Sequence, residues 1–157
     1  MSHLTTVKTK YKDVDALKTA LEKLGFEVTV AKYNLLEIKN MYGQLYDKKC
    51  CVKAVMRNDL PAGTISPKKK QYGEMGFSRE ADGTLVLIAD HMDVELAAAK
   101  AWCPRYTDGN IKPWAKALPK AYSYEVTMAM IRRKGYAVAM ETTDATGQIH
   151  VRVQRRN

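Results

Sequence analysis

The chain has 157 residues, of which 46% are hydrophobic, and this is enough for one folded core that needs no disulfide or metal. No run approaches the roughly 18 consecutive apolar residues of a transmembrane helix, and three cysteines do not form the paired framework of a secreted disulfide-rich domain. Lys and Arg number 26 against 17 Asp and Glu, a net charge of +9 that favours acidic partners such as nucleic acids or acidic protein surfaces.

The first thirty residues predict a strand, a helix and a second strand. Thr and Val without breakers favour a strand over residues 4–10. Asp13 is a typical N-cap, and apolar residues recur at helical spacing up to Gly25, where the helix is expected to end. Residues 26–30 alternate between apolar and polar side chains, which is typical of a strand with one buried face.

The next segment predicts strands followed by a long loop. Residues 33–39 are expected to be extended, and residues 49–57 to form one strand with Cys50 and Met56 on the same face. Prolines, glycines and a lysine run predict a long basic loop over residues 58–75.

The strongest hairpin signal is the turn sequence Ala81-Asp82-Gly83. It lies between two runs, residues 77–80 and 84–89, that are expected to pair as antiparallel strands. Closing such a turn favours glycine at positive φ, so Gly83 is expected there.

The second half predicts two helices and a terminal hairpin. A helix is expected over residues 93–102, followed by an irregular connection at about 104–120, where prolines and a glycine recur. Helical spacing resumes over residues 121–134, and strands at 136–142 and 148–154 follow. In the last strand apolar side chains alternate with basic and polar ones, so one face should join the core and the other should be wet and basic.

Together these elements predict a single α+β domain over residues 1–157. We expect a mainly antiparallel sheet of about six strands with two or three helices packed against it. The order helix, glycine, aromatic, strand occurs at residues 24–28 and again at 134–138, but any helix-to-strand turn looks like this, so a shared origin is the weaker interpretation. The residues expected in one shared core are Leu17, Leu21, Val28, Val52, Leu87, Ile131, Val138 and Val151.

No motif for catalysis, metal binding or nucleotide binding is present. The chain lacks G-x-S-x-G, glycine-rich phosphate loops and Cys-x-x-Cys, and the adjacent Cys50 and Cys51 would face opposite ways in a strand. Cys103 is expected to be an inert, half-buried thiol, although the neighbouring Arg105 would activate it if it were exposed. We therefore expect no enzyme, no catalytic residues, no metal site and no cofactor.

Positive charge is concentrated in two stretches. Residues 47–70 hold seven basic and two acidic residues, a net +5, and residues 100–134 hold eight and two, a net +6, so the rest of the chain is slightly acidic. Aromatic residues in or beside both stretches suit stacking on single-stranded bases, whereas burial of the two tryptophans in the core is the structural alternative. The residues expected to bind a polyanion or a partner are Lys48, Lys49, Lys68, Lys69, Lys70, Arg105, Arg132, Arg133, Lys134, Arg155 and Arg156.

Several segments resemble one protein family. They are MSHLTTVKT at residues 1–9 with DAL at 15–17, GFSREADGT at 76–84 with LIAD at 87–90, and residues 122–156. The chain is similar here to domain of unknown function 1257, the hypothetical chloroplast reading frame 35 proteins. The resemblance implies no particular activity. Members of that group often occur beside AAA-type ATPases, which implies an accessory role.

Two functions from different classes follow. The first is a non-enzymatic adaptor or structural subunit of a larger protein assembly, with an AAA-type ATPase as one candidate partner. The alternative is a module that binds RNA or single-stranded DNA through the basic surface. The expected compartment is the cytoplasm, or the plastid stroma for a chloroplast-encoded chain, without a membrane partner.

Overall fold

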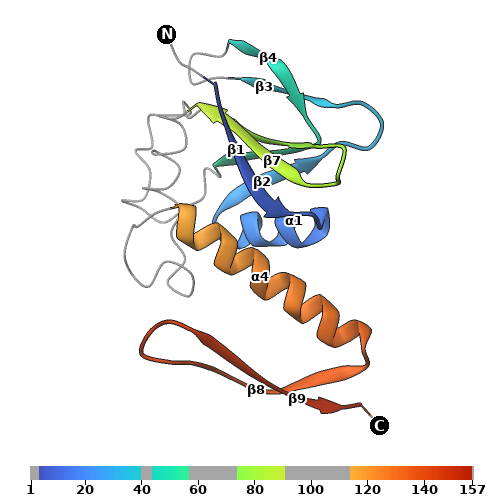
Figure 1. Ribbon diagram of the computed structural model, residues 1–157, viewed down its shortest axis with the longest axis vertical. Helices are drawn as coiled ribbons and strands as arrows, with labels where there is room; N and C mark the ends of the chain where they lie inside the picture. Colours follow the sequence, from blue (N-terminus) through green and yellow to red (C-terminus); the bar gives the residue numbers. More distant parts are fainter. Residues whose placement is uncertain (1–3, 40–43, 57–73, 91–113, 157) are drawn as a thin grey trace.

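The computed structural model describes residues 4–39, 44–56, 74–90 and 114–156 (Figure 1). Two helices and three antiparallel sheets form this part of the chain. In chain order its elements are β1 (Leu4–Tyr11), α1 (Val14–Lys23), β2 (Phe26–Val30), β3 (Leu36–Lys39), β4 (Leu45–Cys50), β5 (Val52–Met56), β6 (Met75–Arg79), β7 (Leu85–Asp90), α4 (Trp114–Arg133), β8 (Tyr136–Thr143) and β9 (Ile149–Arg155).

The strands are divided among three sheets. The largest has five strands in the order β1-β7-β6-β5-β2, and β3–β4 and β8–β9 form separate two-stranded sheets. Every pairing between these strands is antiparallel. The expected α+β class is confirmed. The sheets differ in size from the expected one of about six strands, because the two hairpins pair only within themselves among the described strands.

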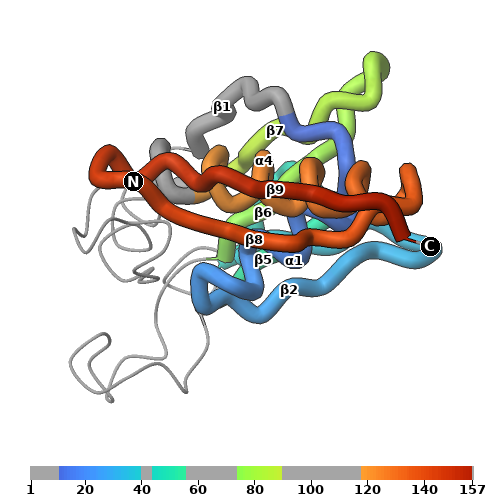
Figure 2. The backbone as a smooth tube through the Cα atoms, turned by 90° about the horizontal axis from the view of Figure 1, so that it is seen from below, coloured from blue at the N-terminus to red at the C-terminus, as the bar shows by residue number. Residues whose placement is uncertain are grey.

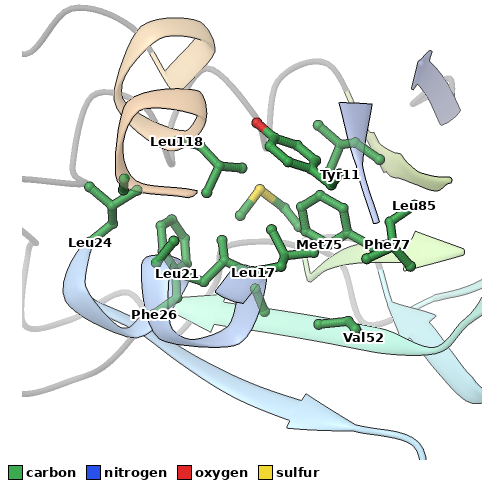
Figure 3. Close-up of a cluster of buried hydrophobic side chains, with 14 of the residues drawn as sticks. Tyr11, Leu17, Leu21, Leu24, Phe26, Val52, Met75, Phe77, Leu85 and Leu118 are labelled. Carbon is green, nitrogen blue, oxygen red and sulfur yellow. The ribbon is translucent and has the colours of Figure 1, made fainter. Parts of the chain in front are cut away.

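The main core lies between the five-stranded sheet and the two helices (Figure 3). Leu17 and Leu21 of α1 pack against the sheet, and Leu118 of α4 closes the cluster. Four of the predicted core residues are buried in it, namely Leu17, Leu21, Val52 and Leu87, and Val28 packs against it half-buried. The other three, Ile131, Val138 and Val151, are half-buried outside this cluster, because they belong to the far end of α4 and to the terminal hairpin.

The β3–β4 hairpin covers the opposite face of the sheet. Ile38 and Cys50 pack there against Ile88, whose chain neighbour Leu87 faces the main core. Successive strand residues point to opposite faces, so β7 contributes to both clusters. The five-stranded sheet therefore has a hydrophobic cluster on each face. The two helices cover one face, and β3–β4 covers the other.

The single strand predicted over residues 49–57 is interrupted at Cys51. The backbone N–H of Cys51 donates to the carbonyl of Phe77 at 2.9 Å, and its carbonyl accepts from Ala31 N–H at 2.8 Å. Cys50 therefore ends β4 and Val52 begins β5, and the two residues are buried in different clusters. The backbone hydrogen bonds of Cys51 with Phe77 and Ala31, both distant in sequence, fix the bend between the two strands.

The second helix begins earlier than the sequence predicts. α4 starts at Trp114, so residues 114–120 of the expected irregular connection are helical, with Pro119 inside the helix. A proline removes one backbone hydrogen bond from a helix. Leu118 and Ala121 on either side of it are buried in the main core, and this packing keeps the segment helical. Most of the loop predicted at 58–75 lies outside the described residues, but Met75 already belongs to β6. The helix predicted at 93–102 and the first part of the connection, residues 104–113, also lie outside them.

The central hairpin forms as predicted. β6 pairs with β7 from Gly76↔Ile88 to Arg79↔Leu85. Gly83 has φ +87°, and the Asp82 side chain accepts a hydrogen bond from Thr84 N–H at 2.9 Å.

Neither described helix is long and apolar enough to cross a bilayer.

Candidate partner-binding surface

The most distinctive surface of the described chain is its C-terminal arm, which we define as residues 130–156, the end of α4 with the hairpin β8–β9. Figures 1 and 2 show this hairpin lying along α4, which separates it from the five-stranded sheet. Tyr124 in α4 donates its hydroxyl hydrogen to Glu141 in β8 at 3.0 Å, and Ile149 in β9 packs against the main core. These contacts hold the hairpin β8–β9 against α4 and the main core.

The hairpin has an inner and an outer face. Side chains that alternate along β8 and β9 make an inner row that is half-buried, Tyr136, Val138, Ile149 and Val151. The outer row is exposed and consists of Met140, Thr142, His150, Arg152 and Gln154. The predicted wet, basic face is therefore present. The predicted core face is only half-buried, because it lies beside a single helix, and its Val153 remains 39% exposed.

The arm brings two groups of cations to one place. Arg132 and Arg133 end α4, and the turn at Gly135, with φ +79°, leads into β8. The backbone N–H of Arg156 then donates to the Gly135 carbonyl at 3.1 Å, so the end of β9 returns to the end of the helix. Arg155 pairs with the residue that follows that glycine. All four arginine side chains are exposed.

The other predicted basic residues do not all join this group. Lys134 is exposed and lies in the turn after α4. Lys48 and Lys49 are exposed in β4, which lies at the opposite end of the molecule from β8–β9 in Figure 1. Lys68, Lys69, Lys70 and Arg105 lie outside the described residues.

The acidic residues of the arm are held by internal partners. Asp144 accepts hydrogen bonds from Thr146 N–H at 2.9 Å and Gln148 N–H at 3.0 Å, and pairs with His150 at 2.8 Å. The Thr146 hydroxyl also donates to Asp144, and the hydrogen bonds from this hydroxyl and from His150 hold the pKa of Asp144 far below its usual range. Glu141, the arm's other acid, accepts from α4 as described above.

The arm therefore keeps a net positive charge. It contains six Lys and Arg residues and two acids, a net +4. Among the described residues, no ion pair involves any of those six cationic side chains.

Other reactive groups in the described chain are engaged in packing. Burial raises the pKa of the Cys50 thiol to about 11, and Cys51 Sγ lies 3.2 Å from the Phe77 carbonyl as a donor. Glu125, buried in α4, pairs with Lys23 of α1. Within the described ranges no group of three or more His, Cys, Asp or Glu side chains could hold a metal ion.

The residues predicted to bind a partner do not include Arg152 and Met140, although the sequence predicted a wet, basic face in the last strand. Arg152 was identifiable from the alternation in residues 148–154, which places it on the same exposed face as His150. Met140 was not, because a register shift between Val138 and Met140 changes which residues of β8 face outward.

Comparisons with known proteins identify the family to which the chain belongs. The family described as "Protein of unknown function (DUF1257)" matches residues 20–152, which include α4 and most of the arm but not Arg155 and Arg156. The chain is 28% identical over 155 residues to the "Uncharacterized protein ycf35" of Cyanophora paradoxa, across 99% of this chain and 98% of that protein. No solved structure is significantly similar. The resemblance seen in the sequence is confirmed, and the chain belongs to the DUF1257 family.

Proposed function

We propose that this protein is a non-enzymatic adaptor that binds an acidic surface of a protein partner through its C-terminal arm. The observation that carries the proposal is the hydrogen bond between Arg156 N–H and the Gly135 carbonyl. It joins two basic groups that are separated in sequence. Like charges gathered without counter-charges cost free energy in the isolated protein, and an acidic partner would remove that cost.

Stabilisation of the helix end accounts for only some of the basic residues in the arm. Arg132 and Arg133 occupy the last turn of α4, where cations interact favourably with the helix dipole. Arg152, Arg155 and Arg156 belong to or follow a strand, where that effect does not act. Solubility alone needs dispersed charge, not charge gathered at one end.

A protein partner fits the arm better than a nucleic acid does. Exposed apolar side chains accompany the cations, with Met130 47%, Met140 52% and Val153 39% exposed. Methionine and arginine are enriched in protein interfaces. Binding of single strands relies on exposed aromatic platforms, whereas Tyr136, the only Phe, Tyr or Trp in the arm, is half-buried on the inner face.

The proposal extends to a setting. An adaptor of this kind acts within a larger assembly, for which an AAA-type ATPase remains a candidate partner. The proposed compartment is the cytoplasm, or the stroma of a plastid that encodes the chain.

A charge-matched pair of variants tests the proposal. The arm variant carries serine at Arg132, Arg133, Arg155 and Arg156. The control variant carries serine at Lys32, Lys39, Lys48 and Lys49, all exposed and outside the arm, so both lose the same charge. Each is titrated with poly-glutamate and with a structured RNA at low and moderate salt.

We expect the arm variant to bind poly-glutamate about tenfold or more weakly than the parent, and the control to stay within about twofold. Equal binding by the arm variant and the parent would remove the arm from the function. Tighter binding of RNA than of poly-glutamate, lost in the arm variant and falling steeply with salt, would favour the nucleic-acid alternative.

A further inference from the structure

The outer edge of β9 offers unpaired backbone groups. Two hydrogen bonds set which residues point toward β8: Asp144 N–H donates to the Gln148 carbonyl at 2.9 Å, and Arg156 N–H to Gly135 at 3.1 Å. In an antiparallel pair, successive residues direct their N–H and C=O alternately toward and away from the partner strand. The residues of β9 that point away are therefore Ile149, Val151, Val153 and Arg155.

These groups have no strand beside them in the described chain. β9 pairs with β8 in a two-stranded sheet, and Figure 2 shows the two strands side by side along α4. Among the described residues, no backbone hydrogen bond outside that pairing involves Ile149, Val151 or Val153. An edge of this kind is a template for another strand.

We propose that the outer edge of β9 accepts an extended segment of the partner as a third strand, in which acidic and apolar residues alternate. This rests on the proposed function and specifies how the acidic partner is recognised. Main-chain hydrogen bonds would supply part of the affinity, and the two rows of side chains would set the specificity.

The two faces of β9 define the alternation. On the outer face an added strand would place every second side chain beside Arg152 and Arg156, where acidic groups pair favourably. On the inner face the intervening side chains would lie beside Val151 and Val153. Val153 is 39% exposed, so an apolar neighbour there removes further apolar surface from water.

The same charges disfavour a second copy of this chain on that edge. Pairing β9 with β9 would bring Arg152, Arg155 and Arg156 of one copy beside those of the other, and like charges on adjacent strands are destabilising. The positive charge along this edge therefore favours an acidic segment as the added strand.

Peptide probes test the mode of binding without altering the protein. The first is a short peptide in which glutamate and valine alternate, and the second has the same composition with the glutamates in one block. Two further forms of the alternating peptide carry N-methyl groups on the odd or on the even residues.

An added peptide strand would hydrogen-bond to β9 along one of the peptide's two edges, and only every second peptide N–H points to that edge. One methylated form should therefore lose about tenfold or more in affinity, while the other should retain it. The block peptide should bind more weakly than the alternating one. Equal affinity of both methylated forms would overturn strand addition. If the arm variant still lost poly-glutamate binding, the proposed function would survive that result, whereas unchanged binding by the arm variant would overturn both.

A substitution on each edge adds a protein-side test. Val153→Pro removes an outward N–H from β9, and Thr143→Pro removes one from the outer edge of β8. Only the first should weaken binding of the alternating peptide, by about tenfold. If either variant unfolds, hydrogen exchange on the unmodified protein decides: the amides of Val151 and Val153 should exchange fast alone and slowly with peptide, and slow exchange without peptide would overturn the inference.

Discussion

The hydroxyl of Tyr122 in α4 accepts a hydrogen bond from the backbone N–H of Asp13, at 3.0 Å, where α1 begins. The same oxygen accepts from Lys12 N–H at 2.9 Å. The Tyr122 ring also packs edge-on against Tyr11 at 4.7 Å between centroids, and burial with this neighbour raises the pKa of Tyr11 far above its usual range. Because α4 carries the arm, these contacts fix the position of the proposed binding surface relative to the sheet.

Tyr122→Phe should destabilise the fold by about 1–3 kcal/mol, because it leaves two N–H groups at the start of α1 without their acceptor. The free energy of unfolding in urea measures the loss. Tyr33→Phe is the control, since Tyr33 is 96% exposed and its hydroxyl is in water. Equal stability of both variants would show that the hydroxyl of Tyr122 does not anchor α4.

Gly76→Ala should destabilise the contact between the five-stranded sheet and β3–β4. A Cβ at this position would lie 2.8 Å from Cys50 Cβ and 2.9 Å from its Sγ, and would also meet Ile38 Cδ1. Overpacking of this kind costs about 1–3 kcal/mol. In an Ile38→Ala background the same substitution should cost less, because one contacting group is gone, and strictly additive effects would contradict the packing described here.

Cys50 should resist alkylation in the folded protein. It is fully buried, and burial raises its thiol pKa to about 11, so very little thiolate exists near neutral pH. Iodoacetamide at neutral pH, followed by mass spectrometry of the peptide holding Cys50 and Cys51, should find Cys50 unmodified until urea is added. Modification of Cys50 at the rate of a free thiol in native buffer would show that the β3–β4 layer does not cover it.

Because of Asp144, the stability of the terminal hairpin should depend on its carboxylate only in strong acid. Hydrogen bonds from the Thr146 hydroxyl and the His150 ring lower its pKa from 3.8, so the folded state favours the carboxylate. That stabilisation is present above pH 3.8 and is lost only as the pH falls below it toward the folded-state pKa. Amide shifts of Thr146 and Gln148, followed by NMR from neutral to acid pH, should show a carboxyl titration with its midpoint below 3.8, absent in Asp144→Asn. A midpoint at the ordinary value would contradict these hydrogen bonds.

Local signals in the sequence predicted the elements better than their assembly. The cap at Asp13 and the turn at Gly83 depend on neighbouring residues, and both form as expected. The bend at Cys51 depends on Phe77 and Ala31, which are distant in sequence and leave no local pattern. The early start of α4 depends on burial of Leu118, which outweighs the proline beside it.

The same division holds for the candidate surface. The approach of Arg155 and Arg156 to the end of α4 follows from the return of a hairpin, a local property that the sequence contains. Lys48 and Lys49 lie far from that cluster because β3–β4 packs on the face of the sheet opposite the helices (Figure 1), and local patterns do not specify this packing.

Mapping poly-glutamate binding by NMR tests the central claim most directly. The unmodified protein, labelled with ¹⁵N, is titrated with poly-glutamate at moderate salt, and amide shift changes are assigned by residue. The adaptor proposal predicts that the largest changes fall on residues 132–135 and 149–156, with β4 unaffected. Changes spread evenly over all exposed lysines and arginines, or centred on Lys48 and Lys49, would contradict it.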